Sequence, residues 1–251
     1  MGEALLAGLL AAGWAPAAEV RVVEALAPRR AELTERFPEI DVTDTVGPAE
    51  GTVLATKPGD IATACAALGA DAGRVLSIAA GVRLADLEGA LPSGTPVVRA
   101  MPNTPALVGA GAAAIAAGTA ATDDDLAWAE SILSAVGIVV RVAEPLLDAV
   151  TGLSGSGPAY VFLVAEALIE AGVLVGLPRP VAAELAGQTL LGSARLLVEG
   201  DDGPEALRAA VTSPGGTTAA GLRELEQAGV RAAFLDAVVA ATERSRELGG
   251  V

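Results

Sequence analysis

Short apolar runs alternate with helical patterns through the first 143 residues of the chain. The runs are brief and mostly lack polar positions, which is typical of strands buried on both faces of a sheet. They are Val20–Val23, Thr52–Ala55, Arg74–Ile78, Pro96–Arg99, Ala112–Ile115 and Ile138–Val142. Helical patterns at Glu3–Ala12, Ala27–Arg36, Gly59–Leu68 and Asp123–Ala135 separate several of them. This alternation predicts an α/β domain built on a doubly wound, mainly parallel sheet.

The pattern changes after Ala143, where the strand candidates stop and long helical patterns follow one another. They cover Leu146–Thr151, Pro158–Val175, Arg179–Glu199, Glu205–Val211, Thr217–Gln227 and Arg231–Leu248. Small residues such as Ala182, Ala186 and Gly192 let helices approach closely, and an extended helical domain often buries its apolar surface against a second copy. We therefore expect two domains, residues 1–143 and residues 144–251, the second all-α and part of a homo-oligomer.

The beginning of the chain fits the end of a dinucleotide-binding motif. A Rossmann-type domain opens with a strand, a Gly-x-Gly-x-x-Gly turn and a helix. Met1-Gly-Glu-Ala-Leu-Leu6 matches only the last glycine and the helix after it. In this topology the first strand lies between those at Val20–Val23 and Thr52–Ala55, so losing it removes a two-sided hydrogen-bond ladder and part of the cradle for the diphosphate. We expect either that the protein starts upstream of Met1 or that this product is damaged.

Composition and charge argue against several classes of function. The net charge is −15 and no basic run occurs, which argues against nucleic acid and against anionic membrane surfaces as partners. The chain does not begin with a charged segment followed by an apolar core, so we expect no signal peptide. The uncharged stretch from Ala100 to Thr122 is long enough to span a membrane, but a buried strand and turns explain it better. The single cysteine, Cys65, suits a reducing cytoplasm.

The chain contains no histidine, which restricts its chemistry. Ser-His-Asp and Cys-His catalysis are excluded, and a zinc site would have to be built from carboxylates and one thiol. We therefore expect no metal site, and hydrolase and metalloenzyme functions lose most of their support.

The segment Val211-Thr-Ser-Pro-Gly-Gly-Thr-Thr218 offers backbone N–H groups and hydroxyls at the start of a helix. Pro214 fixes φ, Gly215 and Gly216 let the chain turn, and the first-turn amides are free donors at the positive end of the helix dipole. A small carboxylate or phosphate fits such a turn. The alternative, from the motif alone, is an ordinary capped turn between two helices.

Six short segments that span nearly the whole chain form one pattern in order and spacing. They are Met1-Gly-Glu-Ala-Leu-Leu6, Thr56-Lys-Pro58, Ser77-Ile-Ala-Ala-Gly81, Val98-Arg-Ala-Met-Pro-Asn-Thr-Pro105, Leu153-Ser-Gly-Ser-Gly-Pro-Ala-Tyr160 and Val211–Thr218. Together they resemble the pyrroline-5-carboxylate reductases, which catalyse the last step of proline synthesis. The resemblance implies a Rossmann domain, a helical dimerisation domain that interlocks with a partner subunit, and NAD(P)H as hydride donor. It also implies an active site between the cofactor and the helical domain of the partner.

Such a reaction suits a chain without histidine. Reduction of a cyclic imine takes one hydride and one proton, and a ring nitrogen that is already protonated needs no dedicated acid. Most of the catalysis is then positioning of the substrate carboxylate, and we name no residue as catalytic. The turn suits that carboxylate through Ser213, Gly215, Gly216, Thr217 and Thr218, and the resemblance implies contacts from the two threonines. It also places Glu144 near the substrate, where a carboxylate favours an iminium cation; a surface Glu before Pro145 is an equal alternative.

The resemblance and the Rossmann pattern also assign cofactor contacts. The residues are Gly2, Lys57, Pro58, Ala79, Ala80, Gly81, Met101 and Asn103. The alternatives are a solvated loop for Lys57, the only lysine in the chain, core packing for the small residues 79–81, and a rigid turn for the segment that begins at Met101.

The choice between the two dinucleotides depends on the residues after the strand at Val20–Val23. Glu24 is the usual type of acceptor for the ribose hydroxyl of NAD and would repel a 2′-phosphate, whereas Arg29 and Arg30 could bind that phosphate. We expect NADPH as donor, with NADH as a competitor.

Three functions from different classes are consistent with the sequence. The first is an active imine reductase, provided that the first strand is restored. The second is a non-catalytic oligomeric relic of such a reductase. The third is a different Rossmann-plus-helical dehydrogenase that acts on hydroxy acids. Such enzymes usually need a lysine or histidine on the helical domain, and residues 144–251 contain neither.

Overall fold

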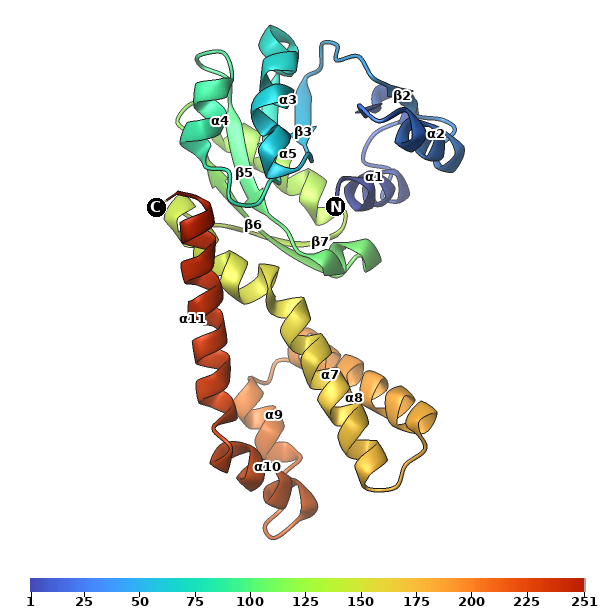
Figure 1. Ribbon diagram of the computed structural model, residues 1–251, viewed down its shortest axis with the longest axis vertical. Helices are drawn as coiled ribbons and strands as arrows, with labels where there is room; N and C mark the ends of the chain where they lie inside the picture. Colours follow the sequence, from blue (N-terminus) through green and yellow to red (C-terminus); the bar gives the residue numbers. More distant parts are fainter. Residues whose placement is uncertain (251) are drawn as a thin grey trace. The chain divides into compact units, whose positions relative to one another are not determined.

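A computed structural model describes residues 1–250 of the chain (Figure 1). The chain divides into two compact units. The first contains Met1–Ser156 together with the chain from Ala240 onward, and the second contains Gly157–Val239.

Among the described residues, the first unit contains seven strands in two separate sheets. They are β1 (Arg21–Val23), β2 (Asp41–Thr43), β3 (Gly51–Leu54), β4 (Arg74–Ser77), β5 (Val97–Met101), β6 (Gly111–Ala117) and β7 (Gly137–Arg141). β1 and β2 form a parallel pair, and the others form a sheet in the order β3-β4-β5-β6-β7. Only β5 and β6 are antiparallel, so the predicted mainly parallel sheet is confirmed.

The interruption between the two sheets falls where the sequence predicts it. β1 pairs with β2, β3 pairs with β4, and within residues 1–250 no pairing joins β1 to β3. A Rossmann-type sheet places one further strand between them. All six predicted strands form within a few residues of their expected bounds, whereas β2 was not predicted.

Helices cover both faces of the five-stranded sheet. Those of the first unit are α1 (Gly2–Ala11), α2 (Ala27–Arg36), α3 (Ile61–Leu68), α4 (Leu84–Ala90), α5 (Asp123–Ser134) and α6 (Leu147–Val150). One buried cluster joins α3, α4 and α6 to the sheet, and a second joins α1 and α5 to it. Neighbouring residues of one strand, Val75 and Leu76 for example, belong to opposite clusters, as the period of a strand buried on both faces requires.

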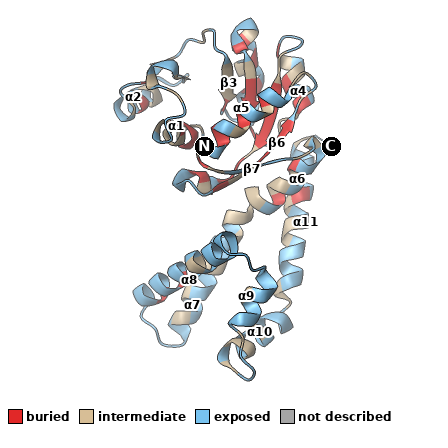
Figure 2. Cartoon of the chain, turned by 180° about the vertical axis from the view of Figure 1, so that it is seen from behind, coloured by how far each residue is buried: buried red, intermediate tan, exposed pale blue. Residues whose placement is uncertain are grey.

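The second unit is helical, as predicted. Its helices are α7 (Gly157–Leu174), α8 (Arg179–Glu199), α9 (Pro204–Ala210) and α10 (Thr217–Gln227), and α11 (Val230–Leu248) begins in this unit. α7 and α8 approach closely, because a Cβ on Gly172 would lie 2.9 Å from that of Ala182. Within this unit only Ala182 and Ala186 are buried, so its apolar side chains are largely exposed (Figure 2).

Candidate functional site

Glu144 opens the short helix η5 (Glu144–Leu146), and its carboxylate makes two contacts inside the first unit. Its Oε1 atom accepts a hydrogen bond from the N–H of Leu84 at 2.7 Å and another from Nη1 of Arg99 at 2.9 Å. The Arg99 side chain is 9% exposed and that of Glu144 29%. A buried cation needs a compensating charge, so this pair holds β5, the start of α4 and the segment after β7 together.

Sequence reasoning did not single out Arg99, although a signal for it was present. It is the one charged residue inside the apolar run Pro96–Arg99, and a charge in a buried strand requires a partner. The partner is Glu144. Its carboxylate is therefore ion-paired and partly buried, rather than free at the surface as the alternative for Glu144 supposed. Its contact with a substrate stays a prediction.

Lys57 and the small residues Ala79–Gly81 follow the parallel strands β3 and β4, and therefore lie at the same edge of the sheet. Lys57 and Pro58 are exposed at the start of the 3-10 helix η2 (Pro58–Asp60). Ala79 is buried, whereas Ala80 is exposed. Gly81 has φ +77°, a conformation that side chains rarely adopt, so a glycine is required at this turn.

Met101 and Asn103 lie at the end of β5 and contact the segment after α6. Asn103 is 9% exposed; its Nδ2 donates to the carbonyl of Ser154 at 3.0 Å, and its Oδ1 accepts from the N–H of Ala112 at 2.8 Å. Met101 lies so close to Gly155 that a Cβ there would come within 2.7 Å of its methyl group. Ser154 and Gly155 belong to a π-helical turn (Thr151–Gly155), a rare geometry that often occurs at functional sites.

Glu24 and Arg29 belong to the two-stranded part of the first unit. One Glu24 carboxylate oxygen accepts from the N–H of Leu26 at 2.9 Å. Arg29 is paired with Glu32 and with Glu3, and these hydrogen bonds, first that to Glu32, raise the pKa of its guanidinium. Glu3 was not among the predicted site residues. It also pairs with Arg36 and so links α1 to α2.

Arg30 has different partners from Arg29. It donates to the backbone carbonyls of Glu24 and Ala25 and lies 3.2 Å from the carboxylate of Asp44. Both arginines that the sequence offers for a phosphate are therefore paired in this structure.

The predicted anion-binding turn, Ser213–Thr218, belongs to the second unit and leads into α10. Gly215 has φ +68°, and the N–H of Gly216 donates to the carbonyl of Ser213 at 3.0 Å. A Cβ on Gly216 would lie 2.4 Å from Oγ of Ser213, so a larger residue there would displace the Ser213 hydroxyl. α10 has Gly216 as its N-cap and no side-chain cap, which fits both an anion-binding turn and an ordinary turn between two helices, so the anion-binding role stays a prediction.

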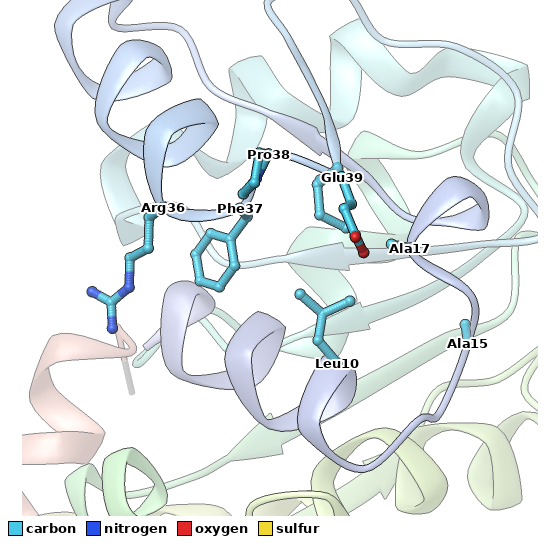
Figure 3. Close-up of a pocket in the computed structure, with 8 residues that line it drawn as sticks. Leu10, Ala15, Ala17, Arg36, Phe37, Pro38 and Glu39 are labelled. Atoms are coloured by element: carbon cyan, nitrogen blue, oxygen red, sulfur yellow. The ribbon is translucent and has the colours of Figure 1, made fainter.

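One hollow of about 440 Å³ is lined by Leu10, Ala15, Ala17 and the segment Arg36–Ile40 (Figure 3). None of these residues was predicted from the sequence to belong to a site. No group of His, Cys, Asp and Glu side chains within residues 1–250 could hold a metal ion.

One helical stretch of the described chain, Glu144–Leu174, has the length and apolar composition of a membrane span. These properties are weak support for a span, because other apolar helices share them. The stretch from Ala100 to Thr122 contains β6 and turns, as predicted.

The comparisons with known proteins decide the family. A protein-family model described as "Pyrroline-5-carboxylate reductase dimerisation" matches residues 144–248. The chain is 47% identical to a pyrroline-5-carboxylate reductase from Synechocystis, over 99% of this chain and 95% of that one. It is 46% identical to one from Mycobacterium tuberculosis, over 99% of this chain and 93% of the relative. This chain belongs to the pyrroline-5-carboxylate reductase family.

Solved structures of pyrroline-5-carboxylate reductases agree with this assignment. One from Coxiella burnetii has a TM-score of 0.93 at 37% identity, covering 98% of this chain and 94% of its own. One from Plasmodium falciparum, solved with NADP bound, has a TM-score of 0.83 at 29% identity, covering 99% and 94%. A prephenate dehydrogenase from Aquifex aeolicus, with a TM-score of 0.53 at 14% identity, shares the fold alone and gives the third hypothesis no support.

Membership of the reductase family also accounts for the exposed apolar helices. The matched dimerisation region contains α7 and α8, whose exposed side chains include Phe162, Leu163 and Leu185. A homo-oligomer covers such surfaces, and the predicted homo-oligomer is thereby supported.

Proposed function

We propose that this chain reduces 1-pyrroline-5-carboxylate to proline with a reduced nicotinamide dinucleotide, NADPH before NADH. Family membership supports the reaction, and the NADP in the Plasmodium relative supports the donor. The observation on this chain that carries the proposal is the glycine turn Ser213–Thr218, which leads into α10 without a side-chain cap.

The start of α10 supplies what a small carboxylate needs. The helix begins at Thr217, and the first helical N–H with a partner in the preceding turn is that of Ala220, which donates to Gly216. The N–H groups of residues 217–219 therefore precede the first intrahelical bond, at the positive end of the helix dipole. Together with the Thr217 and Thr218 hydroxyls they would hold the substrate carboxylate. Hydrogen bonds to a charged acceptor are about twice as strong as those between neutral groups.

Residues at the ends of the strands would hold the dinucleotide. Glu24, Lys57 and Gly81 follow the ends of strands and Met101 is the last residue of β5, and a Rossmann-type sheet holds its cofactor at such positions. The donor would supply the hydride.

We propose that the two predicted domains have different functions. Residues 1–143 bind the dinucleotide, and residues 144–251 dimerise and bind the substrate. Dimers, or assemblies of dimers, would act in the cytoplasm on a small imino acid, without nucleic acid or membrane as partner.

A pair of glycine substitutions in α10 and its turn tests the substrate site. Gly216→Ala displaces the Ser213 hydroxyl, one of the proposed substrate contacts, because the new Cβ would lie 2.4 Å from Oγ, whereas a Cβ on Gly221 in α10 meets nothing within 4 Å. Loss of one hydrogen bond to the carboxylate corresponds to at least about a tenfold rise in KM. We therefore expect Gly216→Ala to raise KM for pyrroline-5-carboxylate, and Gly221→Ala to leave it unchanged.

The assay follows oxidation of NADPH and of NADH in the presence of pyrroline-5-carboxylate, for the parent chain and for both variants. Equal KM values for the Gly216→Ala and Gly221→Ala variants would remove the turn from the site. A parent chain that binds NADPH without reducing pyrroline-5-carboxylate would refute the proposed substrate.

A further inference from the structure

Both ends of the Asn103 side-chain amide are held inside the first unit. Nδ2 donates to the carbonyl of Ser154 at 3.0 Å, and Oδ1 accepts from the N–H of Ala112 at 2.8 Å. The side chain is buried, so these bonds form away from water and fix the amide in one orientation. They join the end of β5 to the second residue of β6 and to the π-helical turn Thr151–Gly155.

The sequence explains why this turn needs a donor from outside. In an α-helix the carbonyl of Ser154 would accept from the N–H of residue 158, but residue 158 is proline and has no N–H. Nδ2 of Asn103 donates to this carbonyl instead. The segment Leu153–Pro158 therefore contains a carbonyl whose partner comes from another part of the sheet.

Hydroxyl groups stabilise the unusual geometry of the π-helical turn. The N–H of Ser156 donates to the carbonyl of Thr151 at 2.8 Å, five residues back along the chain, which is the π-helical spacing. The Thr151 hydroxyl donates to the carbonyl of Leu147 at 2.8 Å, and the Ser154 hydroxyl donates to that of Val150 at 3.1 Å. Bonds of this kind, to the fourth preceding carbonyl, bend helices. The turn is therefore specified by its own side chains as well as by Asn103.

The π-helical turn supports Met101, the last residue of β5. A Cβ on Gly155 would lie 2.7 Å from the methyl carbon of Met101, so the absence of a side chain at Gly155 leaves room for the methionine. Ser77 of β4 pairs with Arg99 of β5, which puts Met101 level with residue 79 at the carboxyl edge of these parallel strands. A Rossmann-type sheet holds its dinucleotide at this edge.

We propose that Asn103 is a positioning residue, which through the π-helical turn fixes Met101 as a wall for the nicotinamide end of the dinucleotide. The proposal rests on the proposed function for the identity of that ligand. Asn103 then acts on the cofactor through Met101. A shift of about 1 Å near the reacting atoms can lower a rate about a hundredfold, so such a support affects the reaction without touching it.

Two neighbouring glycines provide a variant and its matched control. Gly155→Ala pushes the methyl group of Met101 away, and because this methyl group ends a flexible side chain, the fold can absorb the shift. A Cβ on Gly157 meets no described atom within 4 Å, so Gly157→Ala makes the same substitution without displacing Met101. Neither glycine has a positive φ. We expect the urea midpoints of both variants to stay within about 0.5 M of the parent chain.

Calorimetric titration with two ligands separates positioning from a general loss of structure. NADP⁺ carries the nicotinamide ring, whereas adenosine 2′,5′-bisphosphate lacks it. We expect Gly155→Ala to raise the Kd of NADP⁺ about two- to tenfold, the range for a methionine contact with an aromatic ring, and to leave the Kd of the bisphosphate unchanged. Gly157→Ala should change neither. In the reductase assay, kcat should fall about tenfold or more for Gly155→Ala alone.

Asn103→Asp tests the positioning residue itself. The new carboxylate can still accept from the N–H of Ala112, but it has no donor for the carbonyl of Ser154. We expect faster amide exchange in the π-helical turn, NADP⁺ binding weakened about two- to tenfold, and unchanged binding of the bisphosphate. Glu88→Ala is the control beyond the other end of β6, where Glu88 accepts from the N–H of Thr119 at 2.6 Å, and it should change the Kd of neither ligand.

Other results would overturn the proposal. Equal Kd values of NADP⁺ for Gly155→Ala and Gly157→Ala, or a parent chain that does not bind NADP⁺, would show that Met101 is no wall for the nicotinamide. Weaker binding of the bisphosphate to Asn103→Asp would assign Asn103 to the stability of the domain instead. Further weakening by Gly155→Ala in a Met101→Ala background would separate the turn from Met101. The expected changes in binding, without turnover of pyrroline-5-carboxylate by the parent chain, would leave this proposal intact and refute the proposed substrate.

Discussion

Removing the Glu144 carboxylate should destabilise the first unit strongly. The carboxylate accepts from Arg99 and from the N–H of Leu84, and Arg99 is 7% exposed as a whole residue. In Glu144→Ala both donors lose their acceptor and a buried guanidinium loses its counter-charge. Glu144→Gln keeps an acceptor and removes only the charge. The pair of variants therefore separates the charge from the hydrogen bonds.

The burial of the two side chains sets the size of the effect. Breaking a fully buried ion pair costs about 3–5 kcal/mol. Because the Glu144 side chain is 29% exposed, water reaches it, and we expect the lower limit, about 3 kcal/mol, for Glu144→Ala. Glu144→Gln should cost about 1–1.5 kcal/mol. Arg99→Met should cost about 1 kcal/mol, since the freed carboxylate still accepts from Leu84 and can be hydrated.

Urea unfolding followed by tryptophan fluorescence measures these losses. Trp14 and Trp128 are the two tryptophans of the chain, and both lie in the first unit with the ion pair. A loss of about 3 kcal/mol lowers the midpoint by about 1–2 M urea at ordinary slopes. Glu247→Ala is the matched control, because its pair with Arg244 is 62–65% exposed and should contribute less than about 0.5 kcal/mol.

A double-mutant cycle decides whether the two residues act as a pair. We expect Glu144→Ala combined with Arg99→Met to lose about 2 kcal/mol, less than the sum of the single losses. Additive losses, or a Glu144→Ala variant within about 0.5 kcal/mol of the parent chain, would refute the structural role assigned to Glu144.

Three further predictions concern other parts of the molecule. Asn103→Ala should lower the free energy of unfolding by about 2 kcal/mol in the same urea experiment, since it leaves the N–H of Ala112 and the carbonyl of Ser154 without their partner. Burial raises the pKa of the Cys65 thiol above its ordinary value of 9.0. The free energy of unfolding should therefore fall above about pH 9, where the thiol ionises in the unfolded chain but not in the folded one. Melting curves recorded over a pH series should show this fall for the parent chain and not for Cys65→Ala. Leu163→Glu should reduce the molar mass seen by light scattering to that of a single chain, whereas Leu163→Met should not; an unchanged mass would place the dimer interface elsewhere.

Most elements of this fold could be predicted because their apolar pattern is strong. Helices α2, α8 and α10 begin and end at the predicted residues, and β4 and β5 are nearly continuous apolar runs. β2 was missed because Asp41-Val-Thr43 has a single apolar residue and is held by pairing with β1 rather than by burial. A strand defined by its neighbour gives little signal in its own sequence.

The separation of the two sheets could be predicted for a different reason. It follows from a topological rule and not from local pattern, because the strand order of a Rossmann-type sheet places the first strand between β1 and β3. The partners of the charged residues could not be predicted in this way. Arg99 meets Glu144 across 45 residues of chain, and Arg36 meets Glu3 across 33, so both pairs depend on the completed fold.

The Glu3 cluster bears directly on the choice between NADPH and NADH. Arg29, the arginine predicted to bind the 2′-phosphate, is 39% exposed and paired with Glu3 and Glu32. Ion pairs at such exposure contribute about 0–1 kcal/mol, which a phosphate dianion can replace at little cost. Arg29 is therefore available to the phosphate of NADPH, so Arg29→Ala should weaken the preference for NADPH over NADH in the ratio of their KM values, and an unchanged ratio would remove Arg29 from the phosphate site.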